Sequence, residues 1–371
     1  MNGTRGGIAF FLPSLVGGGA ERVFVDLANH FSSQGLPVAM ICARLQGELL
    51  PRLHPEVRRI DLGVPRILSS LLPLWFTLRR HRFEVVFSAM THANVVLLLA
   101  GRLLAGSDGR VVVQEVARFN EGRNLRLARQ ERLVCWLAER LYHRADAVLA
   151  ISDLIVDELQ AGRAKPLKNV VVLPNPVDLE RIRRLGQEPP HHPWLGDGDS
   201  LPVIMGMGRL APEKDFATLI RAFARLQDSV PSRLILVGEG AGRVELQRLV
   251  QSLGLADRVA MPGFLDNPYG DLARCRLFVL SSVAEGFSLA LAEALALGRP
   301  VVVTACGEPP LDMVGRGRYG AVVPVGDVEA MARAMAESLS RKWQSTELSA
   351  RVERYGIDPV ARQYRKILWG D

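Results

Sequence analysis

Cysteine and lysine are both scarce in this chain of 371 residues. The four cysteines lie far apart, and no CxxC pair occurs. This spacing excludes a disulfide framework and a zinc site built on paired cysteines, and it is typical of a reducing compartment. Five lysines leave few candidates for an enzyme that binds pyridoxal through a lysine. These residues are Cys42, Cys135, Cys275 and Cys306, and Lys165, Lys168, Lys214, Lys342 and Lys366.

Long apolar runs are also missing. The chain has no stretch of about 18 uninterrupted apolar residues, which a membrane-spanning helix would require. The first apolar run, residues 8–12, is short and leads directly into Pro13, so no signal peptide is expected. Aromatic and basic residues are not interleaved as they are in nucleic-acid-binding modules. We therefore expect a cytoplasmic protein that binds no nucleic acid.

Positive charge is in excess, with a net charge of +7 and a pI near 9.6. This balance favours anionic lipid headgroups or phosphorylated substrates as partners. Residues 66–82, RILSSLLPLWFTLRRHR, combine leucine, tryptophan and phenylalanine with a basic end. The segment predicts either peripheral association with the inner face of a membrane or an ordinary crossover helix kinked at Pro73. Trp75 and Phe76 are adjacent, so both cannot easily face a core.

Short apolar runs alternate with helical patterns along the whole chain, as in parallel sheets with crossover helices. A stretch rich in proline, histidine, glycine and aspartate, QEPPHHPWLGDGDSLP, divides two such series and predicts a linker. We therefore expect an α/β protein with two Rossmann-like, doubly wound domains facing a cleft, residues 1–180 and 203–355, joined by a linker over 181–202. The expected strands are residues 8–12, 38–42, 85–88, 111–114 and 147–151, then 203–207, 234–237, 259–261, 277–280, 301–304 and 321–323.

Residues 276–303 predict a strand, a helix and a second parallel strand. Ser288 is a candidate N-cap of the helix, and Gly298 stands where a left-handed residue commonly ends one. The preceding loop meets the positive end of the helix dipole, which predicts an anion site. Glu285 in the loop and Glu293 in the helix have an E-x7-E spacing. They are either two ordinary surface carboxylates or ligand-binding groups, and the otherwise apolar surroundings of Glu293 favour the second.

In each expected domain, one glycine-rich loop follows the first strand. After residues 203–207, Gly208, Arg209 and Lys214 predict a diphosphate site, because glycine lets the backbone approach and the two cations provide complementary geometry. A solvated basic loop is the alternative. Near the start, Gly18 and Gly19 open a helix, but no Gly-Lys-Ser/Thr follows, and Arg22 occupies the last glycine position of GxGxxG. A tight turn alone also explains this loop.

Other polar residues follow strands of the first domain. His92 is a candidate catalytic residue or a structural histidine. Glu115, Arg118 and Asn120 are candidate acceptor-binding residues or part of a charged surface loop. The DxD motif at residues 197–199 lies in the expected linker and follows no strand, so we interpret it as a turn and expect no metal site.

Seven segments resemble, in family order, the retaining glycosyltransferases of family 4, which have the two-Rossmann GT-B architecture and use nucleotide sugars. The resemblance covers nearly the whole chain. The segments are VGGGAERVFVDLANHF, VLPNPVD, MGMGRLAPEKDFATLIRAF, LILVGEG, RVAMPGF, EGFSLALAEALALGRPVV and RYGAVVPVGD. One loop departs from the family pattern: CGEPPLDMV lacks the usual glycine-proline or glycine-glycine pair followed by an acid, and Glu308 and Asp312 are the candidates to replace that acid.

The resemblance implies roles for individual residues. Glu293 would bind the ribose and Glu285 the sugar, while Arg209 and Lys214 would stabilise the leaving diphosphate without a metal or other cofactor. His92 would be catalytic or orient the sugar, and a C-terminal helix, residues 356–371, would cross back to the first domain. The remaining donor-binding residues would be Gly18, Gly19, Gly208, Glu239, Met261, Phe264, Gly286, Phe287, Ser288 and Leu289.

The function implied is transfer of a hexose or N-acetylhexosamine, with retention, from a nucleoside-diphosphate sugar to a lipid-linked or cell-envelope glycan. UDP is the preferred nucleotide and GDP the second. Three alternatives remain open at this point: a UDP-sugar epimerase of similar architecture, a pyridoxal-dependent phosphorylase, and a non-catalytic nucleotide-sugar-binding protein at a membrane surface.

Overall fold

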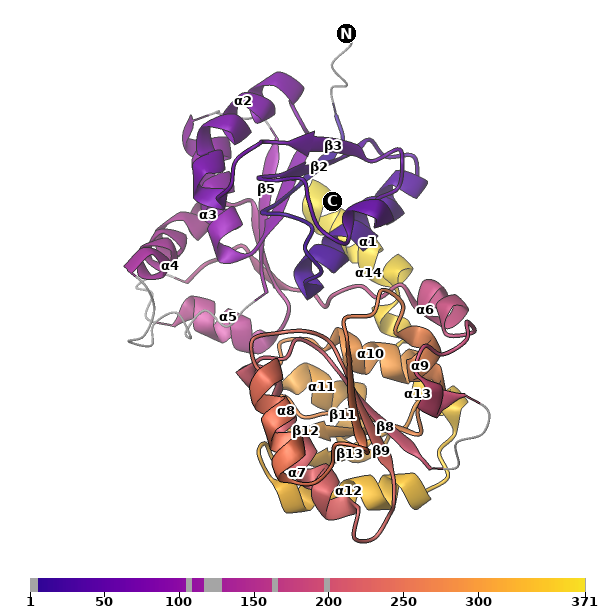
Figure 1. Ribbon diagram of the computed structural model, residues 1–371. Helices are drawn as coiled ribbons and strands as arrows, with labels where there is room; N and C mark the ends of the chain where they lie inside the picture. The colour runs from indigo at the N-terminus through magenta and orange to yellow at the C-terminus, as the bar shows by residue number, and fades with distance from the viewer. Residues whose placement is uncertain (1–5, 105–108, 117–128, 162–165, 197–200, 371) are drawn as a thin grey trace. The chain divides into compact units, whose positions relative to one another are not determined.

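A computed structural model describes residues 6–104, 109–116, 129–161, 166–196 and 201–370. The chain forms two compact units (Figure 1). Unit 1 comprises residues 1–176 and 357–371, and unit 2 comprises residues 177–356. Val177 and Gly356, the first and last residues of unit 2, are paired in a parallel β-bridge. The amide of Val177 donates a hydrogen bond to the carbonyl of Tyr355 (2.8 Å).

Unit 1 contains a seven-stranded parallel sheet of order β3-β2-β1-β4-β5-β6-β7. Its inner strands read as continuous apolar runs because helices cover both faces. In Figure 1, α1 and α14 lie together on one side of this sheet, and α2 and α3 lie on the other. The elements are β1 (Ile8–Leu12), α1 (Gly19–Ser33), β2 (Val38–Cys42), β3 (Arg58–Asp61), α2 (Leu71–His81), β4 (Val85–Ala89), α3 (Thr91–Leu98), β5 (Arg110–Glu115), α4 (Arg129–Leu141), β6 (Ala147–Ala150), α5 (Asp153–Gln160), β7 (Val170–Val172) and α14 (Ile357–Trp369).

Aromatic side chains fill the core of unit 1. The ring centroids of Phe24 and Phe87 lie 4.6 Å apart, and Phe10 packs on both rings. Helix α14 enters this core from the C-terminal end of the chain: Tyr364 lies 5.9 Å from Phe87, and its hydroxyl accepts a hydrogen bond from the side-chain amide of Gln114 (3.0 Å). The last helix is therefore an integral part of the first unit.

Unit 2 contains a six-stranded parallel sheet of order β10-β9-β8-β11-β12-β13. Helices α7, α8 and α12 pack on the apolar core of one face, and α9, α10 and α13 belong to the other. The elements are α6 (Leu179–Leu185), β8 (Val203–Met207), α7 (Phe216–Leu226), β9 (Arg233–Val237), α8 (Arg243–Ser252), β10 (Val259–Gly263), α9 (Tyr269–Arg274), β11 (Leu277–Leu280), α10 (Leu289–Ala296), β12 (Val301–Thr304), α11 (Glu308–Met313), β13 (Ala321–Val323), α12 (Val328–Ser340) and α13 (Ser345–Ala350).

Both sheets show the dinucleotide-binding strand order, which reverses between the first and fourth strands. The two Rossmann-like units expected from the sequence are thus present. Two strands were not expected, β3 and β7, and both are edge strands of unit 1. Arg58 and Arg59 are exposed in β3, so this strand lacks the apolar run by which the inner strands are recognised.

The stretch expected as a linker, residues 181–202, has a different place in the structure. Its described residues belong to unit 2, and helix α6 packs on α9 and α10. Asp178 caps α6 by accepting a hydrogen bond from the amide of Arg181 (3.0 Å), and Leu179 and Ile182 are buried. Close packing on unit 2 therefore holds a segment whose composition suggested a flexible connection.

The segment 66–82 forms a short 3₁₀ turn followed by α2. Pro73 is the third residue of α2, where an N–H group has no partner within the helix, so the proline removes no helical hydrogen bond. Within the described part of the chain, no helix is both long and apolar enough to cross a membrane.

Candidate functional site

The expected anion site of unit 2 lies where the strand order reverses, at the carboxyl ends of β8 and β11. Here Lys214 Nζ lies 2.5 Å from Glu285 Oε1. Ser282, the second residue after β11, donates its hydroxyl proton to the same oxygen (2.7 Å). The Glu285 side chain is only 9% exposed and that of Lys214 24% exposed, so solvent screens the pair weakly. Two residues that are distant in sequence thus form one charged centre.

The backbone around Glu285 is held by a close approach of two loops. The Glu285 amide donates to the Cys306 carbonyl (2.8 Å), and a Cβ on Gly307 would lie 2.3 Å from the Glu285 carbonyl oxygen. Glycine is therefore required at position 307. Burial raises the pKa of the nearby Cys306 thiol to about 11, so this cysteine is a neutral thiol at physiological pH.

Lys214 is positioned by a turn with an unusual backbone. Asp215, the next residue, is left-handed (φ 43°), and its carboxylate caps α7 by accepting a hydrogen bond from the Thr218 amide (3.2 Å). A left-handed non-glycine residue costs roughly 1–2 kcal/mol, which the cap helps to offset. Ser281 also donates to the Lys214 carbonyl (2.7 Å). The lysine is thus fixed against the loop that carries Glu285.

Arg209 presents a guanidinium group at the same end of the sheet. Its side chain is 72% exposed and pairs with Glu213 (2.6 Å). A Cβ on Gly238 would lie 1.9 Å from the carbonyl oxygen of Gly208, the residue before Arg209. The loops after β8 and β9 therefore meet backbone to backbone. Such exposure leaves Arg209 accessible to an anionic ligand, and a surface ion pair of this kind contributes little stability.

The candidates that follow β9 and lie in or after β10 form a neighbouring group. Arg243 pairs with Glu239 (2.7 Å) and donates a hydrogen bond to the Met261 carbonyl (2.7 Å). Phe264 is 48% exposed, and an exposed aromatic ring offers a flat apolar face. This edge therefore combines an apolar face with fixed polar groups.

Helix α10 begins as expected. The Ser288 hydroxyl accepts a hydrogen bond from the Leu291 amide (3.4 Å), and Phe287 packs edge-on against Tyr355 with ring centroids 5.3 Å apart. The amides of Gly286 to Leu289 stand at the positive end of the helix. Further along, Glu293 is buried at 1% exposure and accepts a hydrogen bond from the Tyr269 hydroxyl (3.2 Å). Tyr269 was not expected at the site, since no feature of the sequence distinguishes it from a core tyrosine.

The candidates of unit 1 lie at the carboxyl ends of β1, β4 and β5. Gly18 is the N-cap of α1, and Gly19 is its first residue. The carboxylate of Glu21 lies against Gly18, because a Cβ there would come within 2.2 Å of its oxygen. His92 is half-buried in the first turn of α3, after Met90 with its strained backbone (φ 74°).

Glu115 is fully buried in unit 1. Its carboxylate accepts hydrogen bonds from the hydroxyls of Thr91 (3.0 Å) and Tyr142 (2.7 Å). Burial, followed by the charge of Glu115, raises the pKa of Tyr142 well above its usual value. The structure thus places Glu115 inside a polar network that ties β5 to α3. Arg118 and Asn120, the other expected acceptor residues, lie outside the described residues.

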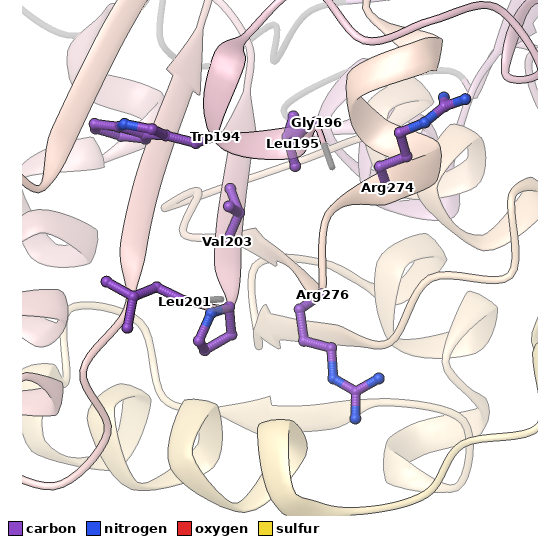
Figure 2. A pocket seen from close by; sticks show the side chains of 8 residues that line it. Trp194, Leu195, Gly196, Leu201, Val203, Arg274 and Arg276 are labelled. Atoms are coloured by element: carbon purple, nitrogen blue, oxygen red, sulfur yellow. The ribbon is translucent and has the colours of Figure 1, made fainter. Parts of the chain in front are cut away.

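A pocket lies at the opposite, amino end of the unit 2 sheet, where β8 and β11 begin. Figure 2 shows Arg274 and Arg276 on one side of it and Trp194 on another. It is distinct from the charged centre at Lys214 and Glu285. Among the described residues, no group of three or more histidine, cysteine, aspartate or glutamate side chains is arranged to hold a metal ion. The DxD motif at residues 197–199 lies outside the described part of the chain.

Comparison with known proteins agrees with this arrangement. The sequence model of the family described as Glycosyltransferase Family 4 matches residues 17–181, and that of Glycosyl transferases group 1 matches residues 193–358. The lipopolysaccharide core biosynthesis glycosyltransferase LpsE of Rhizobium meliloti is 37% identical over 172 residues, which are 45% of this chain and 49% of that protein.

Similarity to two other proteins extends over the whole chain. The structure of Anabaena HepE in complex with UDP and glucose superimposes with a TM-score of 0.79 at 21% identity, covering 97% of this chain and 98% of that one. The N-acetylgalactosamine-N,N'-diacetylbacillosaminyl-diphospho-undecaprenol 4-alpha-N-acetylgalactosaminyltransferase of Campylobacter jejuni is 32% identical over an alignment of 387 residues, which covers 98% of this chain and 99% of that enzyme. Both family models match in order, and the similarity to the Campylobacter enzyme covers nearly the full length of the chain. The chain therefore belongs to glycosyltransferase family 4, a family whose members have the GT-B fold.

Proposed function

We propose that the protein transfers a hexose or N-acetylhexosamine from a nucleoside-diphosphate sugar, preferably a UDP-sugar, to a lipid-linked or cell-envelope glycan. The single observation that carries the proposal is the partly buried Lys214–Glu285 pair at the carboxyl end of β11, next to the N-terminus of α10. A cation and a helix N-terminus favour a diphosphate, while a carboxylate beside them accepts hydrogen bonds from sugar hydroxyls.

The proposed chemistry assigns a task to each group. Lys214, Arg209 and the amides of residues 286–289 stabilise the negative charge that develops on the leaving diphosphate. Glu285 orients the sugar, and Glu293 binds the ribose. Because these cationic groups neutralise the leaving group, we propose that transfer needs no metal ion or other cofactor. Gly18, Gly19 and His92 of unit 1 are assigned to the diphosphate and the sugar, and the configuration of the anomeric carbon is retained.

Names of relatives support the choice of substrates. The Campylobacter enzyme transfers N-acetylgalactosamine to a saccharide on diphospho-undecaprenol, as its name states. HepE was crystallised with UDP and with UDP-glucose. These names support a UDP-sugar as donor and a lipid-linked acceptor for the present protein, in biosynthesis of an envelope glycan.

A peripheral membrane location is part of the proposal. Leu72 and Phe76 on α2 are 59% and 63% exposed, and this helix carries no acidic residue. Its last turn contains Arg79, Arg80 and His81. An apolar face beside clustered positive charge suits the surface of an anionic bilayer, where a lipid-linked acceptor would be found.

Nucleotide binding tests the donor first. Thermal denaturation of the purified protein with UDP, GDP and ADP, each at the same high concentration, should reveal stabilisation by the correct nucleotide, of about 2.7 kcal/mol where its concentration is a hundred times its dissociation constant. Glu293→Ala should abolish this stabilisation. If no nucleotide stabilises the wild-type protein, the proposed donor site is rejected.

Turnover tests the reaction. With the donor sugar and a polyprenyl-diphosphate saccharide, the enzyme should release nucleoside diphosphate only when the acceptor is present, and EDTA should not change the rate. Proton NMR of the product should show the anomeric configuration of the donor. Conversion of the donor sugar without any acceptor would instead indicate an epimerase, and inversion at the anomeric carbon would contradict the proposed mechanism.

A further inference from the structure

The contact between Tyr269 and Glu293 is buried on both sides. Each side chain is only 1% exposed, and the tyrosine hydroxyl donates a hydrogen bond to Glu293 Oε1 (3.2 Å). Glu293 lies in the middle of α10, among alanine and leucine residues. A carboxylate in such surroundings is costly unless donors compensate it. The tyrosine therefore helps to hold a charged group in an apolar helix.

Tyr269 is itself held in place by the segment that precedes β8. The amide of Tyr269 donates to Asn267 Oδ1 (3.0 Å), and the side-chain amide of Asn267 donates to Glu188 (2.6 Å). A Cβ on Gly270 would lie 2.8 Å from the Glu188 carbonyl oxygen. The backbone of residues 188–189 thus closely approaches the first turn of α9.

A second anchor acts at the other end of this segment. Asp271 is 1% exposed and accepts hydrogen bonds from the amides of His191 (3.2 Å) and His192 (2.9 Å). Helix α9 is therefore fixed on both sides of Tyr269. These contacts set the position of the Tyr269 hydroxyl.

A fixed donor restricts how the carboxylate can turn. An ionised carboxylate has two oxygens and about four acceptor positions, and a donor held at Oε1 favours one orientation of the whole group. A vicinal diol presents two donors at a fixed separation, so its recognition depends on that orientation. Sites built to bind a hydroxyl reject the analogue that lacks it, because a buried acceptor is then left unpaired.

We propose that Tyr269 is a positioning residue that orients the Glu293 carboxylate toward the ribose hydroxyls, so that the pair makes the donor site select ribonucleotides over 2′-deoxyribonucleotides. This rests on the proposed function, in which unit 2 binds a nucleoside diphosphate. Tyr269 touches Glu293 and acts on the nucleotide only through that carboxylate.

The test compares nucleotide pairs that differ in one hydroxyl. Dissociation constants of UDP and 2′-deoxy-UDP, and of the matching guanosine and adenosine pairs, are measured by calorimetry on the wild-type protein and on Tyr269→Phe. We expect the wild type to prefer the bound ribonucleotide at least tenfold over its deoxy form. Tyr269→Phe should raise the dissociation constant of the ribonucleotide about tenfold and change that of the deoxyribonucleotide by less than twofold. The preference for the ribonucleotide should then largely disappear.

Two further variants control the comparison. Tyr319→Phe removes a hydroxyl from another tyrosine of unit 2, one that packs against Arg318 and Arg351, and should leave both constants unchanged. Glu293→Gln alters the carboxylate while keeping Tyr269, and should also remove the preference. It provides the same readout if Tyr269→Phe does not fold. Thermal denaturation without nucleotide reports on folding in each case.

The outcomes separate this proposal from the proposed function. If Tyr269→Phe weakens the binding of both nucleotides equally, or changes the binding of neither, the positioning role is overturned while the proposed nucleotide binding stands. A preference that survives in Glu293→Gln would overturn it as well. Failure of the wild-type protein to bind any of the nucleoside diphosphates would reject the proposed function, and this proposal with it.

Discussion

At the scale of single residues, the proposed donor site depends on glycines as much as on charged groups. Gly307 allows the loop after β12 to contact the carbonyl of Glu285, and Gly238 allows the loop after β9 to contact Gly208. In both places backbone occupies the position that a side chain would need. The Lys214–Glu285 pair is consequently held by main-chain contacts that no substitution of a neighbouring side chain would remove.

We expect Gly307→Ala to disable the site more than it destabilises the protein. The added methyl group would lie 2.3 Å from the Glu285 carbonyl, so the loop that carries this carboxylate must move. Displacing groups by about 1 Å costs roughly a hundredfold in rate, whereas unfolding free energy should fall by about 1–3 kcal/mol. Steady-state kinetics and urea denaturation measure the two effects.

Gly254→Ala is the matched control. Gly254 also has a positive φ (69°), but nothing lies within 4 Å of the added methyl group. Alanine there should cost roughly 1 kcal/mol of stability through backbone strain and leave the rate unchanged. Equal rates in Gly307→Ala and the wild type would show that the contact with the Glu285 loop is dispensable.

At the scale of elements, the packing of α2 bears on the two interpretations of residues 66–82, a membrane-associated segment and an ordinary crossover helix. Leu74 and Leu78 face the core, while Leu72 and Phe76 point outward and the ring of Phe76 packs edge-on against Trp75. The guanidinium of Arg79 lies 5.2 Å from the Trp75 ring centroid. One face of the helix thus packs as an ordinary crossover helix does, and the other face remains apolar and basic.

Vesicle binding should depend on this outer face. We expect the wild-type protein to float with vesicles containing phosphatidylglycerol and not with pure phosphatidylcholine, because the attraction combines apolar burial with charge. Leu72→Ser with Phe76→Ser should reduce the bound fraction at least fivefold, while UDP binding stays unchanged. Leu253→Ser, at an exposed leucine of unit 2, serves as control. Flotation that is indifferent to the α2 changes would contradict a role for this helix.

Elements whose residues face apolar surroundings on both sides were predictable from the sequence. The inner strands and α10, with Ser288 as its cap and Gly298 left-handed, are as expected. The edge strand β3 was missed because Arg58 and Arg59 face solvent. Segment 181–202 was interpreted as a linker from its composition, yet it makes specific contacts. Asp271, which is distant in sequence, accepts hydrogen bonds from the amides of His191 and His192. Such long-range polar contacts leave no local pattern.

The same reasoning applies to the site. Lys214 and Glu285 were predictable because each follows a strand at the point where the sheet order reverses. The contact of Tyr269 with Glu293 was not predictable, because it depends on the packing of α9 against α10. Glu115 also follows a strand, but its partners Thr91 and Tyr142 come from two other elements, and only the structure reveals its burial.

At the scale of the whole molecule, each unit has a sheet and a core of its own. We expect residues 177–356, produced alone, to unfold cooperatively and to bind the same nucleoside diphosphate as the full chain within about threefold, because the charged residues of the proposed donor site, Arg209, Lys214, Glu285 and Glu293, lie in this range. Calorimetry on the fragment and on its Glu293→Ala variant measures this. A folded fragment that binds no nucleotide would show that unit 1 supplies an essential part of the donor site.

The bridge between Val177 and Gly356 has a consequence for how such proteins diversify. Unit 2 is topologically an insert: it interrupts unit 1 once, and its two ends are adjacent. Recombination at these two junctions would exchange the whole unit as a cassette without cutting either sheet. A chimaera that carries residues 177–356 of a relative should therefore fold and take that relative's nucleotide preference, so that donor choice and acceptor choice can be inherited separately.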